Sequence, residues 1–193
     1  MTSYADTRDV VGRPAAWWGM LILIASESTL FGCFIGSYYY LRFRSATWPP
    51  HGIPEPKLVV PLILLAVLLT TVVPMRLAAK AAATGRLAAT RLFLALALVV
   101  QSGYFAYEVH DFSDQLHGFD ITRDAYSSIY YTLLGAAHTH VAAGILMSMW
   151  LVLRLVTGLT RYRLAAVRAI AFYWYAVAVI GVVVALCLAA AAL

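Results

Sequence analysis

Long apolar runs separated by short polar segments make up most of this chain. The pattern predicts five membrane-spanning helices, at about 15–41, 58–79, 88–109, 126–153 and 168–192. A helix of about 20 apolar residues, rising ~1.5 Å per residue, crosses a hydrocarbon core of ~30 Å. We therefore predict an all-α integral membrane protein in which residues 1–193 form a single transmembrane domain, a five-helix bundle.

Composition and charge agree with this class and indicate an orientation. Hydrophobic residues make up 63% of the chain and charged residues only 12%, which excludes an ordinary soluble domain. Ten of the 14 Lys and Arg residues lie in the N-terminal segment, the 76–91 region and the 154–168 region. Because cytoplasmic segments carry the excess of Lys and Arg, we expect a cytoplasmic N-terminus and an external C-terminus.

The net charge of +5 is better explained by membrane topology and by attraction to anionic headgroups than by nucleic-acid binding. Arginine has a planar fork of donors that suits bidentate contact with phosphate. The candidate lipid-phosphate ligands in the predicted cytoplasmic clusters are Arg76, Arg86, Arg91 and Arg161.

Glu27 lies near the centre of the first apolar run. A carboxylate at that depth costs about 2.5–3.5 kcal/mol on the insertion scale, and the surrounding leucines offset part of this cost. Such a side chain should face protein, water or a headgroup rather than acyl chains. Glu27 is therefore a candidate functional carboxylate, and the alternative is a structural hydrogen bond or a helix-pairing role.

Small residues recur every four positions beside Glu27, at Ser28, Gly32 and Gly36. This spacing allows another helix to approach closely in a membrane. The fourth run repeats the arrangement, because His140 shares a face with Gly144. We expect both stripes to be packing seams.

The remaining candidates are polar residues of the third and fourth runs. Glu108 follows Tyr104 on one face of the third run, near its predicted outer boundary, where a solvated carboxylate is the simpler interpretation. His140 falls near mid-depth, as Glu27 does, so a hydrogen bond between the two is geometrically feasible. His138 and His140 point about 200° apart on a helix, so the spacing argues against a shared haem or metal site.

Several segments, taken together and in order, resemble subunit III of the haem-copper cytochrome c and quinol oxidases. Residues 17–42, WWGMLILIASESTLFGCFIGSYYYLR, followed by WPP at 48–50, are similar to the opening helix of that family, with Glu27 at the intramembrane glutamate. The fourth run ends its motif as HVAAG, at 140–144, and the last run contains FYWYAVAVIGVVV, at 172–184. The resemblance covers about residues 15–185 and fits the short, five-helix form of the family.

The resemblance implies a subunit without its own catalytic site, cofactor or metal, with haem and copper in the partner catalytic subunit. It implies packing against oxidase subunit I and the other oxidase subunits. It also implies binding of structural phospholipid and support of proton uptake, in the inner (plasma) membrane of a prokaryote. The function would be aerobic electron transport.

Four positions depart from the family's pattern. Ala137 stands where the family has a second histidine, and His138 is shifted by one residue. Tyr175 and Ala178 stand at the family's closing His and Asp positions. These departures keep open the equivalent subunit of a nitric oxide reductase. An autonomous proton-coupled transporter that uses Glu27 is a further alternative, although no inverted repeat is visible.

The orientation can be tested with reporter fusions. We expect fusions within 1–14, 80–90 and 157–165 to report a cytoplasmic location and a fusion after Leu193 to report an external one. A cytoplasmic C-terminus would contradict either the orientation or the number of helices.

Overall fold

The computed structural model describes residues 15–53, 59–118 and 120–192, and these residues form five long helices. The helices are α1 (Ala15–Arg44), α2 (Val59–Ala83), α3 (Leu87–Gly118), α4 (Ala125–Leu155) and α5 (Arg161–Ala192). All five are long and apolar enough to cross a membrane. The predicted all-α fold with five spanning helices is therefore confirmed. The predicted cytoplasmic segment 1–14 lies outside the described residues.

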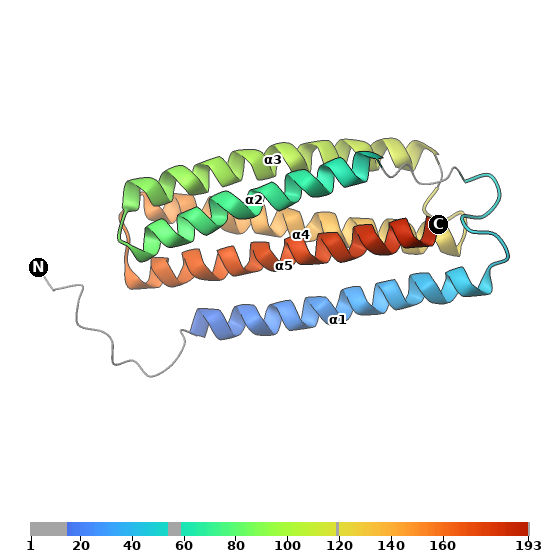
Figure 1. The fold of residues 1–193 in the computed structure, drawn as a ribbon, viewed down its shortest axis with the longest axis horizontal. Coiled ribbons are helices and arrows are strands. Elements are labelled where there is room, and N and C mark those ends of the chain that lie inside the picture. The colour runs from blue at the N-terminus through green and yellow to red at the C-terminus, as the bar shows by residue number, and fades with distance from the viewer. Residues whose placement is uncertain (1–14, 54–58, 119, 193) are drawn as a thin grey trace, which may run out of the picture.

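Successive helices alternate in direction, so the start of α1 and the end of α5 lie at opposite ends of the bundle (Figure 1). Four helices form a ring in which α2 packs on α3, α3 on α4, α4 on α5, and α5 on α2. Helix α1 lies outside this ring, against α4 and α5. Only Phe31 and Tyr38 of α1 are buried.

Two helices extend well beyond the boundaries predicted from hydropathy. Helix α3 continues to Gly118 instead of ending near 109, and α5 begins at Arg161 instead of 168. The apolar run marks the part of a helix that fits the hydrocarbon core, whereas the hydrogen-bonded helix continues into the polar zone. In α3, polar side chains bond within the extension, as Gln115 does to Asp111 at 2.7 Å.

The ring is held together by close contacts at small residues. A Cβ atom on Gly144 of α4 would lie 2.8 Å from the ring of Trp174 on α5. Trp174 is completely buried, and its indole N–H donates to the Ser148 hydroxyl at 3.1 Å. Gly144, a predicted packing position, therefore lies at a close contact between α4 and α5. A second close contact joins α5 to α2, because a Cβ on Gly181 would lie 2.8 Å from Leu68.

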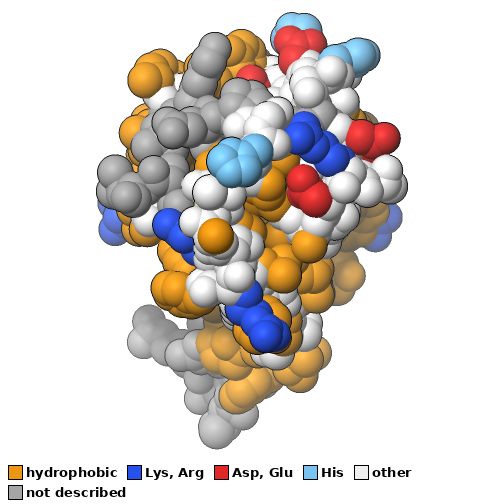
Figure 2. Space-filling view, turned by 90° about the vertical axis from the view of Figure 1, so that its right-hand side faces the viewer, with side chains coloured by type: hydrophobic (Ala, Val, Ile, Leu, Met, Phe, Trp, Pro, Cys, Tyr) orange, Lys and Arg blue, Asp and Glu red, His pale blue; other side chains and the backbone are white. Residues whose placement is uncertain are grey.

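The two ends of the bundle differ in their side chains. At one end, tight turns join α2 to α3 and α4 to α5 through glycines with positive φ, Gly85 (71°) and Gly158 (107°). Figure 2 looks onto the opposite end, and it shows acidic, basic and histidine side chains on the end face with hydrophobic side chains around its flanks. A charged end and an apolar flank are what a membrane-spanning bundle requires.

The Gly144 contact gives a stability prediction. We expect Gly144→Ala to lower the free energy of unfolding by about 1–3 kcal/mol, because the added methyl group meets two buried rings that have no room to move. The matched control is Gly135→Ala on the same helix, where a Cβ would meet nothing within 4 Å. Thermal unfolding of the purified protein in detergent compares them, and equal destabilisation of both variants would contradict the prediction.

Candidate functional site: two carboxylate–imidazole pairs on α4

Helix α4 lies between α1 and α3 and presents a histidine to each of them. His140 reaches Glu27 of α1, with 2.7 Å between His140 Nε2 and Glu27 Oε2. His138 reaches Glu108 of α3, with 3.3 Å between His138 Nε2 and Glu108 Oε2. His138 and His140 are two positions apart on the helix, so they point to nearly opposite faces. The spacing that argued against one shared metal site therefore produces two separate ion pairs.

The contact between Glu27 and His140, which their similar depth in the membrane made feasible, is present in the structure. The side chain of Glu27 is 25% exposed and that of His140 is 15% exposed. His140 Nδ1 lies 2.6 Å from the carbonyl oxygen of Ala136, one turn back on α4. A carbonyl only accepts, so Nδ1 carries a hydrogen. Nε2 then either donates to a carboxylate as imidazolium or accepts from a protonated carboxyl group. In both cases the pair holds one shared proton and is neutral overall, which suits a site inside a membrane.

Neighbouring groups hold the His140 ring and its backbone in place. The ring of Phe31 lies edge-on to the imidazole, with 5.2 Å between ring centroids. The hydroxyl of Tyr173, from α5, donates to the backbone carbonyl of His140 at 2.9 Å. Helices α1, α4 and α5 therefore meet at this pair.

Glu108 is not the solvated boundary residue that its sequence position suggested. Its side chain is 16% exposed, and it accepts a hydrogen bond from the Tyr104 hydroxyl besides contacting His138. Hydropathy predicts that the third helix ends near 109 and so places Glu108 at the membrane boundary, and for this reason the pair is not predicted from the sequence. Counted from Gly118, where α3 ends, Glu108 lies at a depth close to that of His138 on α4. The true helix end was the signal that would have found the pair.

The predicted seam on α1 is not an intrachain packing surface. Ser28, Gly32 and Gly36 are exposed, and a Cβ on either glycine would meet nothing within 4 Å. The hydroxyl of Ser28 donates to the carbonyl of Ile24 in its own helix. No described helix of this chain packs against this face, so it is open to lipid or to another protein.

The candidate lipid-binding arginines divide into two kinds. Arg76, Arg86 and Arg161 are exposed. Arg91 instead donates to the carbonyls of Leu155 and Val156, at distances of 2.7–3.1 Å. These carbonyls lie at the end of α4, where helix carbonyls lack intrahelical partners, so Arg91 caps that helix.

Among the described residues, no group of three or more His, Cys, Asp or Glu side chains is placed to hold a metal ion. The two histidines instead engage carboxylates on different helices. The molecule is thus a multi-pass helical membrane protein in which Glu27 and Glu108 are each paired with a histidine of α4.

The family model described as "Cytochrome c oxidase subunit III" matches residues 4–189. The chain belongs to this family, and the resemblance in its motifs is confirmed.

Individual relatives agree with the family model. A "Cytochrome c oxidase subunit 3" from Bacillus subtilis is 28% identical over 170 residues, which cover 85% of this chain and 80% of that protein. A "Probable cytochrome c oxidase subunit 3" from Nocardia farcinica is 26% identical over 84% of this chain and 81% of that protein. A "Heme-copper oxidase subunit I+III" from Aeropyrum pernix is 28% identical over 84% of this chain, which corresponds to 20% of that protein.

Substitution of Glu27 tests the pair with His140. We expect Glu27→Ala to lower the free energy of unfolding by about 1–3 kcal/mol, because it leaves a buried imidazole nitrogen without a partner. Glu27→Gln retains hydrogen-bonding groups and should cost less. Thermal unfolding in detergent measures both, with Ser26→Ala as the control because Ser26 bonds only to the carbonyl of Leu23 in its own helix. Equal losses in the Gln and Ala variants would count against a hydrogen-bonded pair.

Proposed function

We propose that this chain is the non-catalytic, cofactor-free subunit III of a terminal haem-copper oxidase in aerobic electron transport. In this proposal the haem and copper belong to the partner catalytic subunit. The chain packs against oxidase subunit I and the other oxidase subunits in the inner membrane of a prokaryote. It stabilises the catalytic subunit, binds structural phospholipid and supports proton uptake.

The observation that carries the proposal is the open face of α1 beside the Glu27–His140 pair. In lipid there is no hydrophobic driving force between helices, so close packing at small residues and interhelical hydrogen bonds hold them together. Ser28, Gly32 and Gly36 have no packing partner among the residues that the structure describes, and another protein's helix would satisfy such a face. The fused subunit I+III relative supports subunit I as that partner.

The Glu27–His140 pair has a structural role in this proposal. It anchors α1 to α4 at mid-membrane, and α1 then presents its small-residue face in a fixed orientation. The pair would therefore contribute to the endurance of the assembled complex more than to a single turnover. The exposed Arg76, Arg86 and Arg161 are suited to lipid phosphates.

Alternative functions are weaker but testable. The departures at Ala137, Tyr175 and Ala178 favour the equivalent subunit of a nitric oxide reductase as the second candidate. The haem spectrum of the purified complex, with its consumption of oxygen or nitric oxide, distinguishes the two. Family membership favours an oxidase subunit over an autonomous proton-coupled transporter.

The packing proposal predicts the effect of a bulky residue on α1. We expect Gly32→Leu to reduce the amount of subunit I that co-purifies with this chain, because the added side chain separates the two helices. Quantitative mass spectrometry of the complex after affinity purification measures the ratio of subunits.

Gly103→Leu on α3 is the matched control, because Gly103 is also exposed and a Cβ there would meet nothing within 4 Å. Full retention of subunit I by the Gly32 variant would count against the α1 interface. Equal loss in both variants would show that the effect is not specific to α1.

A further inference from the structure

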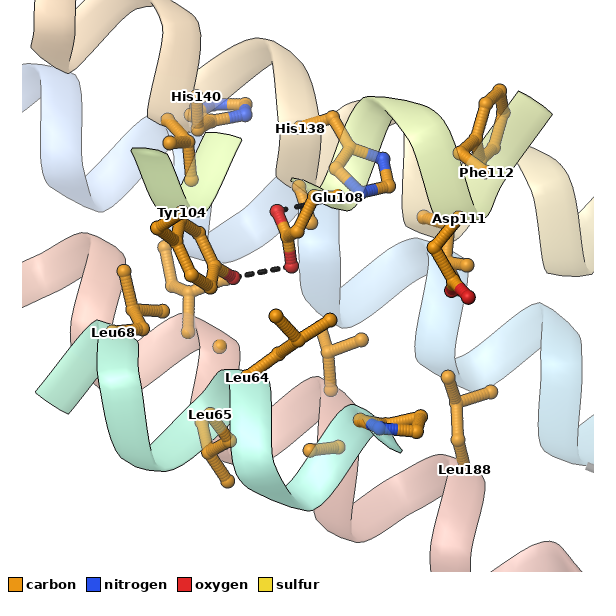
Figure 3. Close-up of a pocket in the computed structure, with 18 of the residues that line it drawn as sticks. Leu64, Leu65, Leu68, Tyr104, Glu108, Asp111, Phe112, His138, His140 and Leu188 are labelled. Atoms are coloured by element: carbon orange, nitrogen blue, oxygen red, sulfur yellow. Dashed lines mark hydrogen bonds and ion pairs between the residues drawn. The ribbon is translucent and has the colours of Figure 1, made fainter. Parts of the chain in front are cut away.

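The ring of α2–α5 encloses a cavity of about 120 Å³ on the side of α4 that faces away from α1. Its wall from α2 and α5 is apolar, with leucines such as Leu64, Leu65 and Leu68 (Figure 3). Its wall from α3 and α4 combines apolar residues such as Phe112 and Leu134 with all of the polar ones. The polar residues that line it are Tyr104, Glu108, Asp111, Gln115, Tyr130, His138 and His140.

The cavity extends from the middle of the bundle to one end. Leu68 and Val141 line it at mid-bundle, whereas Pro61, Gln115 and Leu188 line it near the end of the bundle where α2 begins and α3 ends. This is the end opposite the two glycine turns. The arginines that are proposed to contact lipid therefore lie toward the other end of the bundle.

The size and the polar groups of the cavity suit water. One water needs roughly 10–15 Å³ of such space and two to four polar partners, so the cavity has room for several. Gln101 lies one turn before Tyr104 on the same face of α3, but it does not itself line the cavity. It is completely buried, and neither its amide nitrogen nor its amide oxygen has a hydrogen-bond partner among the described residues. Buried polar groups of this kind normally have a partner in the protein or in ordered water.

The Glu108–His138 pair lines this cavity. His138 Nε2 lies 3.3 Å from Glu108 Oε2. With one proton between these atoms, the pair is either imidazolium beside carboxylate or neutral imidazole beside a protonated carboxyl group. The Tyr104 hydroxyl donates to the other carboxyl oxygen. Figure 3 shows Glu108 between these two partners.

We propose that Glu108 and His138 form a proton-binding site that exchanges its proton with water in the cavity. Protonation adds one proton from hydronium to the pair, which changes from a carboxylate beside neutral imidazole to a neutral pair with one shared proton. Release returns that proton to water, and no other reactant is needed. The site is separate from Glu27 of α1, which does not line the cavity, although its partner His140 does.

The charged and titratable groups around the site are few. Helix α3 contributes Tyr104 and Asp111, and α4 contributes Tyr130 and His140, of which His140 is paired with Glu27. The described lining residues from α2 and α5 are Pro, Leu, Val, Ile, Gly and Ala, and none of these titrates. The Glu108–His138 pair is therefore the pair in the cavity wall best placed to gain or lose a proton near neutral pH.

Nuclear magnetic resonance of the full chain with ¹⁵N-labelled histidine tests the site. The His138 ring signals are assigned from their loss in His138→Gln. We expect them to shift reversibly between about pH 5 and about pH 8 in the wild-type protein. Glu108→Gln should abolish or displace this transition. Tyr104→Phe leaves both members of the pair in place and should retain it, which separates loss of the proton site from loss of the fold.

A second measurement tests access through the cavity. Leu64→Trp fills part of the cavity, and we expect it to slow exchange of the His138 ring proton with D₂O several-fold. Leu62→Trp, on the exposed face of the same helix, should leave the exchange rate unchanged. His138 signals that stay constant with pH in the wild type, or a transition unaffected by Glu108→Gln, would overturn the proposal. Equal exchange rates in the Leu64 and Leu62 variants would overturn access through the cavity.

Discussion

Pairing of buried acids with buried imidazoles is the constraint on which the rest of this structure depends. An isolated carboxylate is costly in the middle of a membrane, and a protonated histidine is costly for the same reason. Helix α4 carries two histidines two positions apart, and each contacts a glutamate on a different neighbouring helix. These contacts offset both costs. For His140, the backbone carbonyl of Ala136, one turn back, accepts a hydrogen bond from the other ring nitrogen. Each pair can then stay neutral while it joins α4 to another helix.

The two pairs occupy different environments, and this difference separates their roles. Glu27 and His140 join α1 to the ring, beside a face of α1 on which none of the described helices packs. Glu108 and His138 lie inside the ring, on a cavity with room for water. The first pair can fix the position of a helix that faces a partner protein. The second lines a cavity that extends to the end of the bundle where α2 begins, and this setting suits proton exchange more than packing.

Packing in the ring explains why α1 is the exceptional helix. Between α4 and α5 the backbone of Gly144 lies against the rings of Trp174 and Tyr173, and between α2 and α5 the backbone of Gly181 lies against Leu68. Such contacts depend on close backbone approach and are strong in lipid, where burial of apolar surface gives no advantage. Helix α1 has only two buried residues. It is held by its contacts with α4 and α5, including one buried ion pair and a tyrosine–carbonyl bond from Tyr39 to Cys187.

The sequence by itself determined the helical class, the five spans and the family, because hydropathy is a local property of the chain. It also marked Glu27 and His140 as candidate intramembrane polar residues and Gly144 as a candidate packing position. It could not determine which face of α1 is covered, because small-residue spacing shows where a helix could approach and not whether one does. It misjudged Glu108, because hydropathy marks the edge of the apolar run and the helix continues beyond it to Gly118. Only the tertiary structure decided that His138 meets Glu108, since that contact depends on how far two helices extend and how they align side by side.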